Sequence, residues 1–199
     1  MFIDPFGNME AARSRGFDWG YPPIIDAAAD LLLVTHEHSD HNAVEAIAGV
    51  KQTVRSRAGT FDTPTGKVVG VASEHDQVAG TQRGANVIYV FEMAGTRICH
   101  MGDFGQAGLR PEQIDAIGNV DVLFVPVGGT ATLDGAGAAD VVELLHPSWV
   151  VPMHYRTPAI NFLDTLDGFL SAVKGEVVTL ERAEFDTTDL RAEGGRLIV

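Results

Sequence analysis

The sequence predicts a layered α/β or α+β domain, and two observations carry this prediction. Apolar runs typical of strands fall in two groups along the chain with helical patterns between them, an order that favours layered sheets and helices over an all-β fold. The chain has 199 residues, of which 45% are hydrophobic, so it can bury a substantial core. We therefore expect one domain over residues 1–199.

The N-terminal part predicts a short strand followed by a long loop. The strand at residues 2–3 ends at a proline, and residues 7–23 mix arginine and aromatic side chains with glycine and proline, a composition typical of irregular loops. A loop of this length is either a plain connection or a lid over a binding site. In the second case we expect Trp19 or Tyr21 to face the site.

A dense polar motif follows the apolar run 30–34, which predicts a buried strand. In the motif, residues 35–41, alternate side chains of an extended chain share a face, so His36, His38 and Asp40 can point to one side. Histidines this close repel one another when protonated, which favours a metal site over a charged surface turn. Such a cluster can divide its ligands between two neighbouring ions.

The remaining apolar patterns supply the other elements of the two layers. Strands are predicted at 53–55, 68–72, 86–93, 96–99, 122–127 and 149–153, with terminal strands at 177–180 and 197–199. Helices are predicted at 42–47, 111–117, 138–145 and 160–173. Gly118 and Pro147 are typical signals for the ends of the second and third of these helices.

Three further polar residues stand where predicted strands end. His75, Asp103 and His154 each follow an apolar run. The ends of neighbouring strands can meet in one cleft although they are far apart in the sequence. Each residue alone is a weak signal, but together with the 35–41 motif they complete a ligand set for two metal ions.

Composition excludes several functional classes. A formal charge of −13 and a pI near 4.7 disfavour binding to DNA or RNA, and the short cationic set Lys51, Arg55 and Arg57 is expected to be a solvated face. A single cysteine, Cys99, and the absence of Asn-x-Ser/Thr fit a reducing cytoplasm. No export signal and no apolar run of about 18 residues is present, so we expect a cytoplasmic protein without membrane contact.

Taken together, these motifs resemble the metallo-β-lactamase fold superfamily, and within it the branch of ascorbate-6-phosphate lactonase-like and uncharacterised metal-dependent hydrolases. The similarity runs from Ile3-Asp4-Pro5 to the Met-His-Tyr element at 153–155, with the His-x-His-x-Asp-His run, His75 and Gly102-Asp103 between them in the family order. The resemblance implies a four-layer αββα sandwich of two mixed β-sheets flanked by helices, with metals at one edge.

The resemblance also implies roles for individual residues. One metal is held by His36, His38 and His75, the second by Asp40, His41 and His154, and Asp103 bridges the two. Asp4 matches an acidic residue that orients the histidine cluster by hydrogen bonding. Two adjacent divalent ions, zinc by expectation with manganese and iron open, lower the pKa of a shared water and supply hydroxide near neutral pH. Catalysis is therefore expected to depend on Asp40 and Asp103.

Other polar residues have either a structural or a functional interpretation. His100 either supports the bridging carboxylate or is structural, and His146 is expected to be a helix end. Tyr155 and Thr130 flank the expected site and are candidates for substrate contacts. Cys99 lies in an apolar strand, where inert packing is the better interpretation.

Three functional classes remain open. The first is a hydrolase of a small, anionic ester, lactone or phosphoester; the second is a di-iron oxidoreductase; the third is a metal-binding protein without catalysis. A glutamate in place of His38 and a flavin domain would favour the second class, and a missing ligand the third, so the hydrolase is expected.

Relatives usually carry two strands before the Ile-Asp-Pro element. A misassigned start, a trimmed core or a partner subunit on the exposed sheet edge would explain the difference, and the last would make a homo-oligomer.

Overall fold

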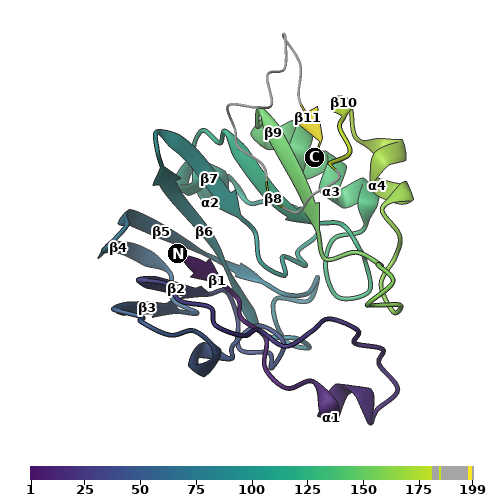
Figure 1. Cartoon of the computed structure of the whole chain (residues 1–199). Helices are drawn as coiled ribbons and strands as arrows, with labels where there is room; N and C mark the ends of the chain where they lie inside the picture. Colours follow the sequence, from purple (N-terminus) through teal and green to yellow (C-terminus); the bar gives the residue numbers. More distant parts are fainter. Residues whose placement is uncertain (181–183, 185–196, 199) are drawn as a thin grey trace.

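The structure is a computed structural model of the chain that describes residues 1–180, 184 and 197–198. Within these residues the strands form two sheets (Figure 1). The smaller sheet is parallel, and its order is β1 (Phe2–Ile3), β2 (Leu31–Val34) and β3 (Gln52–Arg55). The β2 and β3 strands therefore end at the same edge of this sheet.

The larger sheet is mixed, and its order is β10-β11-β9-β8-β7-β6-β5-β4. Neighbours from β4 to β7 are antiparallel, and neighbours from β7 to β10 are parallel. The strands are β4 (Gly59–Thr63), β5 (Gly66–Glu74), β6 (Ala85–Met93), β7 (Thr96–His100), β8 (Val122–Pro126), β9 (Trp149–Met153), β10 (Glu176–Val177) and β11 (Leu197–Ile198).

Helices cover one face of the larger sheet, and the smaller sheet packs on the other. The helices α2 (Pro111–Ile117), α3 (Gly135–Leu145) and α4 (Asp167–Ala172) bury their apolar residues against this sheet. Two shorter elements, α1 (Glu10–Arg13) and the 3-10 turn η1 (Val44–Ala46), lie outside this core. The predicted class, a mixed α/β fold with two layered β-sheets, is confirmed, and its core helices lie on the larger sheet. No helix in the described part of the chain is long and apolar enough to cross a bilayer.

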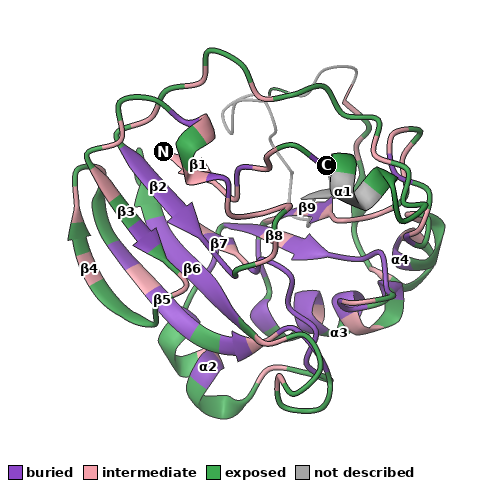
Figure 2. Cartoon of the chain, turned by 90° about the horizontal axis from the view of Figure 1, so that it is seen from below, coloured by how far each residue is buried: buried purple, intermediate pink, exposed green. Residues whose placement is uncertain are grey.

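Strand β6 shows why the core needs apolar residues at successive positions. Most of β6 is buried (Figure 2). Side chains alternate between the faces of a strand, so Val87, Tyr89 and Phe91 pack toward the smaller sheet while Ile88 and Val90 pack toward the helices. The hydroxyl of Tyr89 donates to backbone carbonyls of β2, at 3.0 Å, and β3, at 3.3 Å. A buried phenol that is hydrogen-bonded in this way ties the two sheets together.

The prediction of a helix at 42–47 was wrong, because tertiary hydrogen bonds take up the backbone there. Only the turn η1 forms. The backbone N–H of Ala43 donates to the carbonyl of Pro5, and Ala48 pairs with the 27–29 segment in a β-bridge. A helix could not continue past residue 47 and also make this bridge.

The predicted helix 160–173 is shortened to α4 for a similar reason. The N–H of Asp164 donates to the carbonyl of Gly128, and the N–H of Arg156 donates to the carbonyl of Asp164. These bonds hold residues 156–164 in an irregular path beside the predicted site. The helical pattern is retained only after this segment, over Asp167–Ala172.

Further elements differ from the prediction, among them the strand predicted at 177–180, which is confined to β10 (Glu176–Val177). Strand β4 was not foreseen because it is an edge strand with mostly exposed residues and no apolar alternation. Helix α3 starts at Gly135 rather than at 138, because Asp134 caps it by accepting from the N–H of Gly137 at 2.8 Å. A Cβ at Gly135 would lie 2.3 Å from the backbone nitrogen of Phe169, so glycine permits the contact between α3 and α4.

The cysteine in β7 gives a first prediction. Cys99 is fully buried, and burial raises the pKa of its thiol to about 12. At pH 8 the folded protein therefore holds roughly one thiolate in 10⁴ molecules, and we expect no reaction with a thiol reagent until the chain unfolds. Above about pH 9 the unfolded chain loses this proton first, so folding stability should fall as pH rises toward 12. Rapid labelling of the native protein at pH 8 would contradict the burial.

Candidate metal centre

The candidate centre forms where strand ends from both sheets converge. Asp4 follows β1 and the 35–41 motif follows β2 in the smaller sheet, whereas His75 follows β5, Asp103 follows β7 and His154 follows β9 in the larger sheet. The parallel arrangement brings the ends of β7, β8 and β9 to one edge. The convergence that the sequence predicted is present.

Two groups of side chains in this region have the spacing of metal ligands. The ligand atoms of His36, His38 and His75 all lie within 4.8 Å of one another. The same holds for His41, Asp103 and His154. A third group, in which Asp4 replaces the ligands from the larger sheet, consists of Asp4, His36 and His41.

The carboxylate of Asp103 lies at the centre of these groups. Its Oδ2 atom is 3.1 Å from Nε2 of His75, 3.3 Å from His154, 3.6 Å from His41 and 3.8 Å from His36. Asp40 lies at the margin, with its Oδ2 3.6 Å from Nε2 of His41 and its side chain 32% exposed. Asp103 is thus in contact with both groups, and Asp40 with one.

The donor atoms fit a bound cation. His36 is 1% exposed, and its Nε2 atom has no hydrogen-bond partner among the described residues although it faces the cluster. A buried polar nitrogen without a partner is costly, and a metal ion would satisfy it. Imidazole and carboxylate ligands together suit zinc, manganese and iron.

The cluster also favours positive charge without any ion. Burial acts against protonation of His41, but the carboxylates of Asp103, Asp4 and Asp40 outweigh it and raise the pKa of this histidine to about 10. Burial would likewise raise the pKa of Asp103, but His41 and His154 hold it well below its usual value. For His36, burial and the neighbouring His41 lower the pKa to about 3. The site therefore combines a proton-binding position at His41 with a neutral imidazole at His36.

Asp4 lies beneath the motif and contacts two of its residues. One carboxylate oxygen accepts from the backbone N–H of Thr35 at 2.7 Å, and the other accepts from the Thr35 hydroxyl at 2.6 Å and lies 3.3 Å from Nδ1 of His41. The Thr35 hydroxyl is 2.9 Å from Nδ1 of His36. Asp4 and Thr35 together fix the rings of His36 and His41 so that Nε2 faces the cluster.

Several supporting residues were not recognised in the sequence. The carbonyl of Ala131 is 2.9 Å from Nδ1 of His75, and the hydroxyl of Thr132 is 3.5 Å from Nδ1 of His154. The buried amide of Asn86 accepts from the backbone N–H of Asp103 at 3.1 Å. A polar residue opening an otherwise apolar strand was the available signal for Asn86, whereas a backbone carbonyl leaves none.

His100 lies near the centre without joining either group. Its ring stacks on Phe124, and its Nδ1 accepts from the N–H of Gly102 at 3.2 Å. Burial lowers the pKa of this histidine. His146 is the C-cap of α3, in a left-handed conformation, as expected for a helix end.

The centre opens into two adjoining cavities. One, of about 460 Å³, exposes His41 and contains Tyr155; the other, of about 470 Å³, exposes His38 and contains Thr130. Asp40, Asp103 and His154 line both cavities. The two candidate substrate residues, Tyr155 and Thr130, therefore line different cavities beside the centre.

The 7–23 segment covers the centre. Trp19 lines both cavities and Tyr21 lines the first, which confirms the position expected for a lid. The N–H of Gly20 donates to the carbonyl of Ala159 at 2.7 Å, and the Tyr21 hydroxyl is 3.0 Å from that of Thr157. These contacts dock the segment onto the chain that follows His154.

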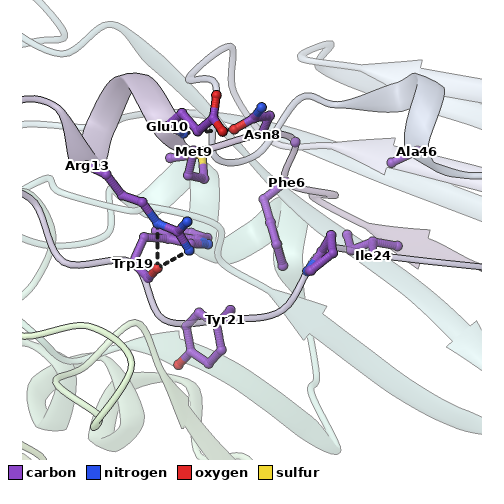
Figure 3. A pocket seen from close by; sticks show the side chains of 11 residues that line it. Phe6, Asn8, Met9, Glu10, Arg13, Trp19, Tyr21, Ile24 and Ala46 are labelled. Carbon is purple, nitrogen blue, oxygen red and sulfur yellow. Dashed lines mark hydrogen bonds between the residues drawn. The ribbon is translucent and has the colours of Figure 1, made fainter.

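The outer side of this segment encloses a third cavity, of about 420 Å³ (Figure 3). The Arg13 guanidinium donates to the backbone carbonyl of Trp19 at 2.6 and 3.0 Å, and the rings of Phe6, Trp19 and Tyr21 pack against one another. The same three aromatic side chains thus separate this cavity from the metal centre.

Comparisons with known proteins agree with this geometry. A family model described as a β-lactamase superfamily domain matches residues 1–154. A metal-dependent hydrolase of Thermococcus kodakarensis is 33% identical over 92% of this chain and 90% of its own length. A solved Thermotoga maritima structure, assigned as a Zn-dependent hydrolase of the metallo-β-lactamase superfamily, has 31% identity and a TM-score of 0.70, covering 89% of this chain and 84% of that one. The chain therefore belongs to the metallo-β-lactamase superfamily, in its family of metal-dependent hydrolases.

Proposed function

We propose that this protein hydrolyses a small, anionic ester, lactone or phosphoester with two divalent metal ions bound at the candidate centre. His36, His38 and His75 would hold one ion, and Asp40, His41 and His154 the other, with Asp103 between them. The observation that supports this division is the position of the Asp103 carboxylate, within 3.8 Å of four imidazole Nε2 atoms from both groups.

Two bound divalent ions would lower the pKa of a water and polarise the bond under attack. The chain's own residues would supply charge, orient the ligands and limit the access of water. Asp103, whose pKa is held low, supplies a permanent negative charge between the two groups. Asp4 and Thr35 hold the histidine rings in orientation, and the lid residue Trp19 limits the access of bulk water.

The cavities support a small substrate. Each holds about 460–470 Å³, within the range of sites for small molecules. A chain with a formal charge of −13 disfavours long polyanions such as nucleic acid, whereas positive charge at the centre can attract a single carboxylate or phosphate. Tyr155 and Thr130, each of which lines one of these cavities, would contact the substrate.

Zinc is the metal that we propose, since the Thermotoga maritima relative is assigned as a Zn-dependent hydrolase. Manganese and iron suit the same ligand types. We expect close to two ions per chain after loading with zinc or manganese, measured by elemental analysis. His38→Ala and His154→Ala should each lower the metal content, because each removes a ligand from a different group.

A matched control is His146→Asn, which changes a histidine at the end of α3 and should leave the metal content unchanged. The loaded protein should then be screened against lactones, phosphodiesters and β-lactams with and without a chelator. A metal content near zero after loading would sink the two-metal proposal. An activity that survived chelation would place the chemistry elsewhere.

A further inference from the structure

An arginine lines the metal-centre cavity that contains Thr130. Arg83 shares this wall with His38, His75 and Asp103, and Arg15 of the lid segment lines the same cavity. Both guanidinium groups belong to segments outside the two ligand groups. The side of the centre that exposes His38 therefore carries positive charge in a protein that is otherwise strongly acidic.

The guanidinium of Arg83 differs from the other cationic groups in its lack of a partner. Within residues 1–180, 184 and 197–198, it makes no hydrogen bond or ion pair with the protein. Every other lysine or arginine there has a partner, which is a carboxylate for Arg55, a backbone carbonyl for Arg97 and an aromatic ring for Arg57. Five donors are thus available at the cavity.

The backbone that carries Arg83 is held in place from within its loop. Asp76 is 8% exposed, and its two carboxylate oxygens accept four backbone N–H groups of the loop, at 2.7–3.0 Å, including that of Arg83 at 2.7 Å. The N–H of His75 also donates to the carbonyl of Gly84 at 3.1 Å. The loop therefore begins at a candidate ligand, closes on itself and holds the backbone of Arg83 in place, while its guanidinium lines the cavity beside that ligand.

We propose that Arg83 is the anchor for a second anionic group of the substrate, a carboxylate or phosphate that does not react, and that Asp76 is the positioning residue that sets its distance from the metals. This inference rests on the proposed function, because the metal centre binds the other end of the substrate. A guanidinium fork pairs with a carboxylate or phosphate through two hydrogen bonds, which suits recognition of such a group. The protein then recognises the substrate at both ends: the metals bind one end and Arg83 binds the other.

The test compares ligands with one and two carboxylates. Calorimetry on the zinc-loaded protein would measure the affinity for acetate and for the dicarboxylates from malonate to adipate, so that no spacing is assumed. We expect one dicarboxylate to bind about tenfold tighter than acetate or better, because of its charge-assisted bond to Arg83. Arg83→Gln should abolish this preference and leave acetate binding unchanged, and Arg83→Lys should keep part of it.

The matched control is Lys67→Gln, which removes the same charge at the opposite end of β5, roughly 25 Å along the strand. It should keep the preference. Asp76→Asn should lose it with the arginine still present and the zinc content unchanged, which a merely structural role would not produce. Equal affinity of the wild type for acetate and every dicarboxylate, or a preference that Arg83→Gln leaves intact, overturns the anchor. Absence of zinc binding would instead overturn the proposed function.

Discussion

Replacing Asp103 by asparagine should lower the hydrolysis rate by roughly two to three orders of magnitude, measured on the best substrate of the panel with saturating metal. Asparagine keeps the shape of the side chain but cannot carry the charge that lies within 3.8 Å of four imidazole Nε2 atoms. Without it, two cations would lie close together with no carboxylate between them. Metal affinity should fall together with the rate.

The control is Asp62→Asn, which makes the same change in a side chain that is 92% exposed. Its rate and metal content should match the wild type. Circular dichroism should show that Asp103→Asn remains folded, because the substitution removes charge and not volume. A variant Asp103→Asn with full activity would show that the reaction does not use this centre.

The second large effect is expected on stability, from Asn86→Leu. Asn86 is 1% exposed and donates to the Ser73 hydroxyl at 2.8 Å and the Met101 carbonyl at 2.9 Å, while it accepts from the N–H of Asp103. Leucine has a similar size but leaves the buried Met101 carbonyl and the N–H of Asp103 without this partner, at a cost of about 3 kcal/mol; the Ser73 hydroxyl keeps its bond to the backbone carbonyl of residue 86. For a chain of this length the melting temperature should fall by roughly 6–12 °C.

Asn119→Leu is the matched control, because Asn119 is exposed and should give a change of less than about 0.5 kcal/mol. Thermal unfolding of the metal-free protein measures both variants without any contribution from bound ions. If Asn86→Leu melted with the wild type, the hydrogen-bond network around Asp103 would have no part in holding the two strands β6 and β7 at the site.

The sequence predicted the ligands of the site, whose chemistry depends on residue type. It did not predict the segments whose backbone is determined by tertiary hydrogen bonds. The run from His36 to His41 could be recognised because three imidazoles in six residues are costly without a ligand. The strand ends at His75 and His154 followed from apolar runs of the right length. The fold class followed from the same runs.

Other features could not be read from local patterns. Residues 160–166 carry a helical pattern but are held as loop by hydrogen bonds to the 128 region. The 42–47 segment is diverted by the bond from the N–H of Ala43 to the Pro5 carbonyl and by the bridge that Ala48 makes with Ala28 just after it. The hydrogen bonds that Asp76 accepts from its loop, and the absence of a protein partner for the Arg83 guanidinium among the described residues, depend on positions that only the folded chain defines. The orientation of the His75 ring is set by the backbone carbonyl of Ala131, and this partner leaves no signal in the sequence because every residue has such a carbonyl.

Because each ligand group is assembled from both sheets, a bound ion would join the two sheets as well as take part in chemistry. His36 and His38 come from the smaller sheet and His75 from the larger one, and the second group is divided in the same way between His41 and His154. An ion in either group would cross-link segments far apart in the sequence, as a disulfide does, and would bind only the native arrangement. Removal of the metal would then weaken the contact between the two sheets before it affected the helices.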